Sequence, residues 1–331
     1  MAPFKSSLAK SAGKLFGVFR EADLSLRGAT QTTRYVVPPL LVGTTNSDST
    51  NPGGSFKYIT WIVDGSFTIG NGPASVNYLL VGGGAEGAQQ NAGGSNGTPS
   101  TALGLTAYGG GSGRYYQAGA SYDGYGGSGG GGGGGGSPTT SLGNKVTGTN
   151  TDIAAPLSPQ GNPGGSAPTI YGGAGGGGAG AAGPNAPGNT SKQPGAIGAA
   201  AMGGDANFPT SYGTAGPSSG RWFAAGGGGA GGTPHGAGGA QPVGGGGAGK
   251  TSTPSATGNA VANTGSGGGA YAASSGGGSG GGGAGGFLSS SMILANGPYS
   301  ITIGTGGSGG NGGDGANGIF VLRVPSSAVV T

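Results

Sequence analysis

Long runs of glycine recur through this chain without a fixed period, and they limit its possible folds more than any other feature. Glycine supplies 92 of the 331 residues, and the run at 129–136 breaks the every-third-residue spacing that a collagen triple helix needs. So much glycine and proline is otherwise typical of disordered chains. Such chains usually avoid collapse by carrying much charge, whereas only 7% of these residues are charged. A flexible chain and a packed glycine structure both stay open.

The glycine-rich stretches alternate with polar segments that contain Pro, Ser, Thr and Asn. They lie at 109–113, 126–136, 172–183, 225–232, 236–247, 264–269, 276–286 and 306–315. A flexible Gly/Ser linker is one interpretation of this sequence. The regular return of glycine instead favours packed polyproline-II-type helices, which make no internal hydrogen bonds and leave their backbone groups free. Neighbouring helices would then satisfy these groups, because glycine lets backbones approach closely on several sides.

Both ends of the chain hold strand-like sequence. Residues 54–81 contain three β-branched or aromatic runs, and the Asp64-Gly65 pair between two of them is a hairpin signal. Residues 287–325 contain three more runs, including the alternating Tyr299, Ile301 and Ile303. We infer that the two ends pair into one small β-sandwich.

The sequence therefore predicts a mainly β chain in four parts. Residues 1–34 are a docking helix and linker, and residues 35–81 are the first half of the β-sandwich. Residues 82–286 are a large inserted bundle of glycine-rich polyproline-II-type helices with loops, and residues 287–331 complete the sandwich.

Residues 3–20 have the pattern of an amphipathic helix. The whole net charge of +4 lies within residues 1–34, since the remainder carries equal numbers of cations and anions. An isolated helix of this length is marginal, so its apolar stripe must be buried. Packing on the chain's own body and a transit peptide stay open, but docking on another protein is favoured because the body has few large apolar residues. The stripe at helical spacing comprises Phe4, Leu8, Ala12, Leu15, Phe16 and Phe19.

Motifs for catalysis or cofactors are weak. Gly244 to Thr251 fits the phosphate-loop pattern by letter, but it lacks the preceding strand and the following helix that aim N–H groups at a phosphate. His235 is the one histidine, and there is no cysteine. Asn311 to Gly315 faintly resembles a calcium-binding glycine turn, and a plain turn is favoured. We therefore predict no enzyme activity, no cofactor and no metal site. The neutral body also argues against nucleic-acid binding.

Two aromatic loops stand out in the insertion as candidates for receptor binding. Tyr, Trp and Arg dominate binding hot spots because they bury much area for little lost entropy. Anchoring of the loops on the scaffold and stacking against sugars are the alternatives. The first loop, 114–125, contributes Tyr115, Tyr116, Tyr122 and Tyr125, and the second, 205–223, contributes Tyr212, Arg221, Trp222 and Phe223.

Three parts of the sequence resemble known proteins. Tyr78-Leu79-Leu80-Val81 before the glycine, and Tyr299 to Gly304 with Gly318 to Val324 after it, resemble the glycine-rich domain of phage tail-fibre and appendage proteins. The glycine stretches resemble the polyglycine-helix sandwich of T-even-like tail-fibre tip adhesins. Residues 4–28 are similar to the N-terminus of virion appendage proteins in marine podoviruses.

The resemblance implies an oligomeric protein of the virion, located in the tail appendage. Other tail or virion proteins would bind the N-terminal helix, and a bacterial surface protein or glycan would bind the loops, which a rigid scaffold carries. A purely structural adaptor or capsid decoration protein is the alternative. An ice-binding or cell-wall protein would share the glycine stretches but would have no use for a docking helix.

Overall fold

The structure is a computed structural model. It describes residues 40–50, 55–71, 73–89, 92–115, 126–134, 160–167, 171–186, 192–231, 238–250, 258–272 and 277–330. These residues belong to one compact unit, Pro38–Thr331. With 33% of residues in strands, the fold is mainly β.

The described elements are short strands and a single turn of 3-10 helix, η2 (Ala201–Gly203). The strands are β1 (Leu40–Thr50), β2 (Phe56–Gly70), β3 (Ala74–Val81), β4 (Ser100–Ala102), β5 (Leu105–Ala107), β6 (Ala199–Ala200), β7 (Thr214–Ala215), β8 (Arg221–Phe223), β9 (Phe287–Leu294), β10 (Gly297–Thr302), β11 (Ile319–Pro325) and β12 (Val329–Val330).

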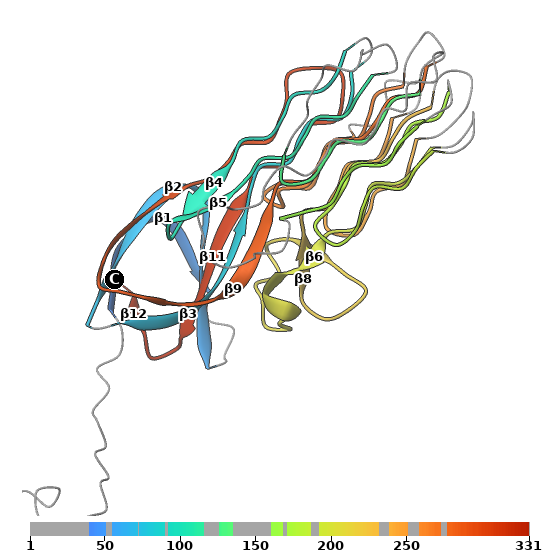
Figure 1. Cartoon of the computed structure of the whole chain (residues 1–331). Helices are drawn as coiled ribbons and strands as arrows, with labels where there is room; N and C mark the ends of the chain where they lie inside the picture. The colour runs from blue at the N-terminus through green and yellow to red at the C-terminus, as the bar shows by residue number, and fades with distance from the viewer. Residues whose placement is uncertain are drawn as a thin grey trace, which may run out of the picture. The chain divides into compact units, whose positions relative to one another are not determined.

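Nine of these strands form one sheet that nearly closes into a barrel. Its order is β5-β4-β10-β2-β11-β3-β9, with β1 beside β2 and β12 parallel to β1. Strands from the two ends of the chain alternate in it, because β11 lies between β2 and β3. Figure 1 shows the glycine-rich part extending from one end of this sheet, with the C-terminus at the opposite side.

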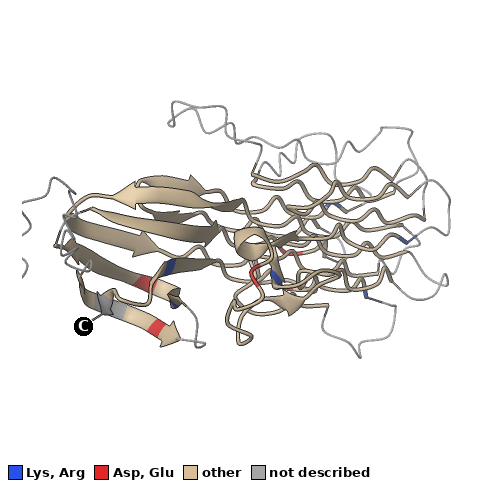
Figure 2. Ribbon diagram, turned by 90° about the horizontal axis from the view of Figure 1, so that it is seen from below, with Lys and Arg blue, Asp and Glu red and all other residues tan. Residues whose placement is uncertain are grey.

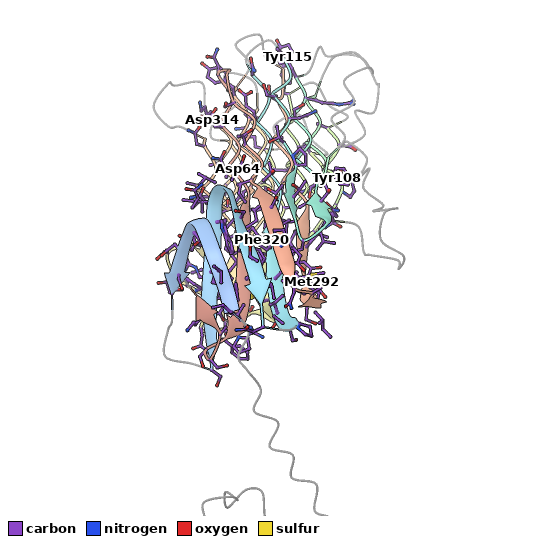
Figure 3. All side chains as sticks on the ribbon, turned by 90° about the vertical axis from the view of Figure 1, so that its left-hand side faces the viewer. Asp64, Tyr108, Tyr115, Met292, Asp314 and Phe320 are labelled. Atoms are coloured by element: carbon purple, nitrogen blue, oxygen red, sulfur yellow. The ribbon has the colours of Figure 1, made fainter. Side chains whose placement is uncertain are left out.

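β2 bends at the end of the sheet from which the glycine-rich part extends. Its first half pairs with β11 and its second half with β10, so Asp64-Gly65 does not join two strands of a hairpin as expected. β1 follows β2 around the same corner through two register shifts. Asn46, with a φ of 56°, donates its Nδ2 hydrogen to the Asp64 carbonyl at 2.7 Å. Figure 3 shows Asp64 at this corner.

The barrel has apolar residues on both sides of its central strands. The inner face holds the larger core, which includes Trp61, Phe67 and Phe320 (Figure 3). On the outer face, Leu79 and Val321 belong to a second cluster. Burial on both faces explains why β3 and β11 read as continuous apolar runs rather than as alternating sequence.

We call the stretches that leave the sheet the glycine segments, and they run side by side (Figure 1). The first continues β3, because Gly82 donates to the carbonyl of Gly286 directly beyond the paired residues Val81 and Phe287. Charged side chains are sparse along them (Figure 2). The segments are residues 82–89, 92–98, 108–115, 126–134, 160–167, 171–186, 192–198, 224–231, 238–250, 258–272, 277–286 and 303–318.

Hydrogen bonds between the glycine segments repeat every three residues. Along residues 82–88, each backbone N–H points to a different neighbour from the one before it, and every third N–H returns to the same neighbour. The consecutive donors Gly82 to Ala88 reach Gly286, Thr98, Ala316, Gly283, Ser95, Gly313 and Gly280. Residues 280–286 follow the same rule, donating in turn to segments 108–115, 171–186 and 258–272 and accepting from others. The backbone is thus bonded on several sides, which a flat sheet does not allow.

Close backbone approach makes glycine necessary in these segments. A Cβ atom on Gly84 would collide with the carbonyl group of Ser266, and one on Gly283 would lie 2.5 Å from the Ser128 carbonyl oxygen. Alanine replaces glycine where a methyl group has room, as at the fully buried Ala85 and Ala284.

The predicted fold class is wrong in its architecture. There is no two-layered sandwich, because β2 and β1 bend and carry one continuous sheet around the core. There is also no bundle of helices, since the described residues contain no helix of seven residues or more. The glycine segments are extended stretches bonded to one another. β4 and β5, from within the predicted insertion, join the main sheet. The helix predicted over residues 3–20 lies outside the described residues.

Candidate functional site

The first candidate site is the end of the glycine segments away from the sheet, which we call the far end. Tyr115 lies there, whereas Tyr108, at the start of the same segment, lies near the strands (Figure 3). Tyr115 is 4% exposed and bridges to Ser279, which also bridges to Ala230. The predicted residues Tyr116, Tyr122 and Tyr125 lie outside the described residues.

Several described stretches stop at the far end. Their backbone bonds place residues 115, 134, 186, 231, 250 and 272 on this side, each after an outgoing segment. The sequences that follow are rich in hydroxyl and amide side chains, such as Thr251 to Thr257 and Pro187 to Ser191. Several described segments that precede polar sequences therefore end on the same side of the compact unit.

The second predicted loop lies beside the barrel instead. β6, β8 and β7 form a small sheet in that order. Phe223 is fully buried, and its ring meets Phe208 edge-on at 5.6 Å. Phe208 in turn meets the ring of Tyr58 on β2 at 5.5 Å. These contacts attach the loop to the outer face of the barrel.

Most polar groups of this loop that are described form hydrogen bonds within the protein. Arg221 donates from Nε to the carbonyl of Tyr212 at 2.8 Å and from Nη2 to the carbonyl of Gly213 at 2.6 Å. The Tyr212 hydroxyl donates to Asp48 Oδ2 at 3.0 Å. Trp222 is half-buried beside Gly216, and its Nε1 is buried without a hydrogen-bond acceptor. Tyr212, Arg221, Trp222 and Phe223 thus lie together, on the barrel rather than at the far end.

A charged cluster that the sequence did not single out holds this loop on the sheet. Asp205 accepts hydrogen bonds from the hydroxyl of Tyr58 and from Nη1 of Arg323, with which it forms an ion pair. Arg323 also lies over the ring of Phe56, 4.5 Å from its centroid. The signal available in the sequence was Arg323 itself, a lone charge within the apolar run of β11.

The pKa values of Tyr58 and Asp205 in this cluster, and of the nearby Tyr212, are shifted by their surroundings. Burial raises the pKa of Tyr58, and the hydrogen bond to the Asp205 carboxylate raises it further. Burial opposes ionisation of Asp205, but hydrogen bonds from Tyr58, the Asn207 amide and Arg323 outweigh it and lower the pKa of that carboxyl. Burial and the bond to Asp48 raise the pKa of Tyr212.

In the described residues, the weak sequence motifs do not form the sites that their patterns suggested. In the phosphate-loop-like stretch, the backbone N–H groups of Gly247 and Lys250 bond to segment 258–272 and that of Gly249 bonds to Gly239, so these donors are already used in the packing of the segments. His235 lies outside the described residues. Asp314 bonds to Asn259, and the described residues contain no group of three or more acidic, histidine or cysteine residues that could hold a metal ion.

Comparison with family models, with curated proteins and with solved structures finds no match to this chain. Within the described ranges, no helix is long and apolar enough to cross a bilayer.

Proposed function

We propose that this chain is a non-catalytic structural protein of a phage virion, located in the tail appendage or fibre, which contributes to recognition of the host surface. Residues 1–34 would attach it to other virion proteins as part of an oligomeric assembly. The far end of the glycine segments would meet a bacterial surface protein or glycan.

The polarity of the compact unit carries this proposal. Leu40, the first described residue, pairs with Gly70 and Val329 at the end of the sheet opposite the glycine segments. The glycine segments leave the other end, and several described segments that precede polar sequences stop at the far end. Such a unit has one end suited to attachment and an opposite end, the far end, suited to contact with a receptor.

The rigidity of the scaffold is the second support. Each described residue of 280–286 donates its backbone N–H to a carbonyl of another segment. The far end is therefore held by hydrogen bonds between the glycine segments. Recognition by variable loops on a rigid frame is a common arrangement.

The test compares incorporation into particles with adsorption to the host. Replacing Tyr116, Tyr122 and Tyr125 by Ser should lower adsorption and leave incorporation unchanged, because these tyrosines follow the far-end residue Tyr115. Deleting residues 1–34 should abolish incorporation.

A matched control is Ile293→Ser, which removes an apolar side chain that is 73% exposed on the barrel. The control should adsorb as wild type does. If the triple tyrosine variant also adsorbs normally, the chain is a structural adaptor or decoration protein without receptor binding. If the truncated chain is incorporated normally, the attachment role of residues 1–34 is wrong.

A further inference from the structure

A polar pocket opens on the outer face of the barrel beside β9, remote from the far end. Its volume is about 290 Å³, and its lining consists of Asn77, Met202, Gly203 and Ser289 to Ser291. Figure 3 labels Met292, which follows the lining residue Ser291 on β9, and so indicates where the pocket lies among the strands. Hydroxyl and amide groups dominate this lining, whereas most ligand pockets are lined by apolar side chains.

The pocket is the open end of a polar row that crosses four strands in register. Ser291 pairs with Asn77, Asn77 with Arg323, and Arg323 with Tyr58. Asp205 occupies the Arg323 and Tyr58 end of the row. The Ser291 and Asn77 end remains uncovered.

Hydrogen bonds within the row orient the groups that face the pocket. Nη2 of Arg323 donates to Oδ1 of Asn77 at 3.1 Å, which fixes the amide and leaves its Nδ2 as a donor. The Met202 amide donates to Oγ of Ser289 at 3.2 Å, so the Ser289 hydroxyl keeps its hydrogen for another acceptor. Ser291 is exposed, and within the described part of the chain its hydroxyl bonds to no other group. Ser290 lies between Ser289 and Ser291 and pairs with Tyr78 of the inner core, so its side chain points to the opposite face of the strand.

A left-handed turn forms the remaining wall. Met202, Gly203 and Gly204 have φ values of 46°, 69° and 83°. Two of the three are glycines, which adopt this conformation without the cost that a side chain adds. The turn brings the half-buried Met202 to β9, where its amide bonds to Ser289 and its side chain packs against the outer-face cluster.

We infer that this pocket binds a single neutral sugar ring. Hydroxyl and amide groups that both donate and accept match the alternating hydroxyls of a sugar, and such groups dominate the lining. Among the described residues, the cation beside the pocket is Arg323, which is already paired with Asp205, so a charged ligand has no unpaired counter-ion there. The volume of about 290 Å³ lies just below the range of about 300–1,000 Å³ for ligand pockets, which favours one ring over an oligosaccharide.

This binding site does not depend on the proposed virion role or on the far end. It is tested with the isolated full-length chain, by following backbone amide resonances in NMR while glucose, galactose, mannose and N-acetylglucosamine are added separately. At least one sugar should cause saturable shifts at Asn77, at Met202 and Gly203, and at Ser289 to Ser291.

Two substitutions and a control make the test specific. Ser291→Ala removes one hydroxyl and should weaken binding about three- to tenfold, as the loss of one hydrogen bond does. Ser291→Leu should fill the pocket and abolish the shifts. Ser300→Ala, which removes an exposed hydroxyl from β10, should bind as wild type.

The outcomes separate the inference from its alternatives. Absence of saturable shifts with all four sugars overturns it, as does binding that survives Ser291→Leu in a folded variant. If Ser291→Leu does not fold, the wild-type titration and Ser291→Ala still decide. Tighter binding of N-acetylneuraminic acid than of any neutral sugar would show that Arg323 is available to an acid, and would overturn the choice of a neutral ligand.

Discussion

Gly283→Ala tests whether the glycine segments are held together by close backbone packing. Gly283 donates to the carbonyl of Gly111 at 2.9 Å and accepts from the amide of Ala85 at 2.9 Å. An added Cβ would lie 2.5 Å from the carbonyl oxygen of Ser128 and 2.6 Å from that of Gly129. Ordinary contacts of a Cβ begin at 3.4 Å. Segment 126–134 would therefore have to move by almost 1 Å.

The expected cost follows from the bonds that this shift disturbs. Segment 126–134 is joined to segment 277–286 through the amides of Ser128 and Gly131. Leaving a buried backbone group unsatisfied costs about 1–3 kcal/mol. A change from glycine to alanine otherwise stabilises by about 0.4–1 kcal/mol through the unfolded chain. The net loss should be about 3 kcal/mol, which is a large share of a typical stability of about 5–15 kcal/mol.

Chemical denaturation of the full chain measures this loss, with Gly70→Ala as the matched control. At Gly70 the nearest atoms to an added Cβ belong to Leu40 and lie at 3.6 Å or more, so the control should unfold within about 1 kcal/mol of wild type. If Gly283→Ala is as stable as Gly70→Ala, the segments are not closely packed and the reasoning fails.

Three further predictions concern other parts of the unit. Hydrogen exchange should be slow at the amides of residues 280–286, which all donate to neighbouring segments, and fast at the exposed Gly309; equal rates would contradict the bonding pattern. Phe223→Ala should lower the free energy of unfolding by about 3–5 kcal/mol, whereas Tyr212→Phe, which loses one exposed hydrogen bond, should cost less than about 1 kcal/mol. The pKa of Asp205 is lowered from its ordinary value of 3.8 in the folded state, so its stabilisation is complete above about pH 4 and is lost as the pH falls through the lowered pKa. Asp205→Asn should therefore cost about 1.5–3 kcal/mol at pH 7, and the difference from wild type should shrink in acid; a difference independent of pH would refute the role of the carboxylate.

The apolar strands within residues 54–81 and 287–325 could be located from the sequence because their composition differs so sharply from that of the rest, whereas β1 and the short strands within the insertion could not. Runs such as Tyr78 to Val81 and Ile319 to Val324 have no counterpart in the glycine stretches. The arrangement of these strands in the sheet could not be predicted from composition. Burial on both faces removes the alternation that would have distinguished layers, and the bend at Asp64 depends on pairing with β1, β10 and β11, which are remote in sequence.

The site predictions met a similar limit. Aromatic clustering pointed to Tyr115 and to Tyr212, Arg221, Trp222 and Phe223, but the same residue types serve recognition and packing. Phe223 is fully buried against the barrel, and the pattern could not show this because Tyr58, Phe208 and Phe223 are separated by many residues. Ser291 and Asn77 form a pocket through strand register alone, so no local motif marks them.

The barrel and the glycine segments depend on each other for order. Glycine loses more conformational freedom on folding than any other residue, and the glycine segments have few side chains, such as Glu86 and Asn162, to select their neighbours. The barrel supplies that selection, because the pairing of Val81 with Phe287 aligns Gly82 with Gly286, and β11 begins directly after the segment that bonds to Gly84 and Gly87. Each backbone hydrogen bond that is fixed at the sheet also determines which residue of a different segment bonds to the next residue. The register of the glycine segments is therefore set progressively from the sheet toward the far end. The bonds join residues remote in the sequence, and contacts of this kind fold slowly. Substitutions in the barrel that shift the β3–β9 register should for this reason disorder glycine segments that they do not touch.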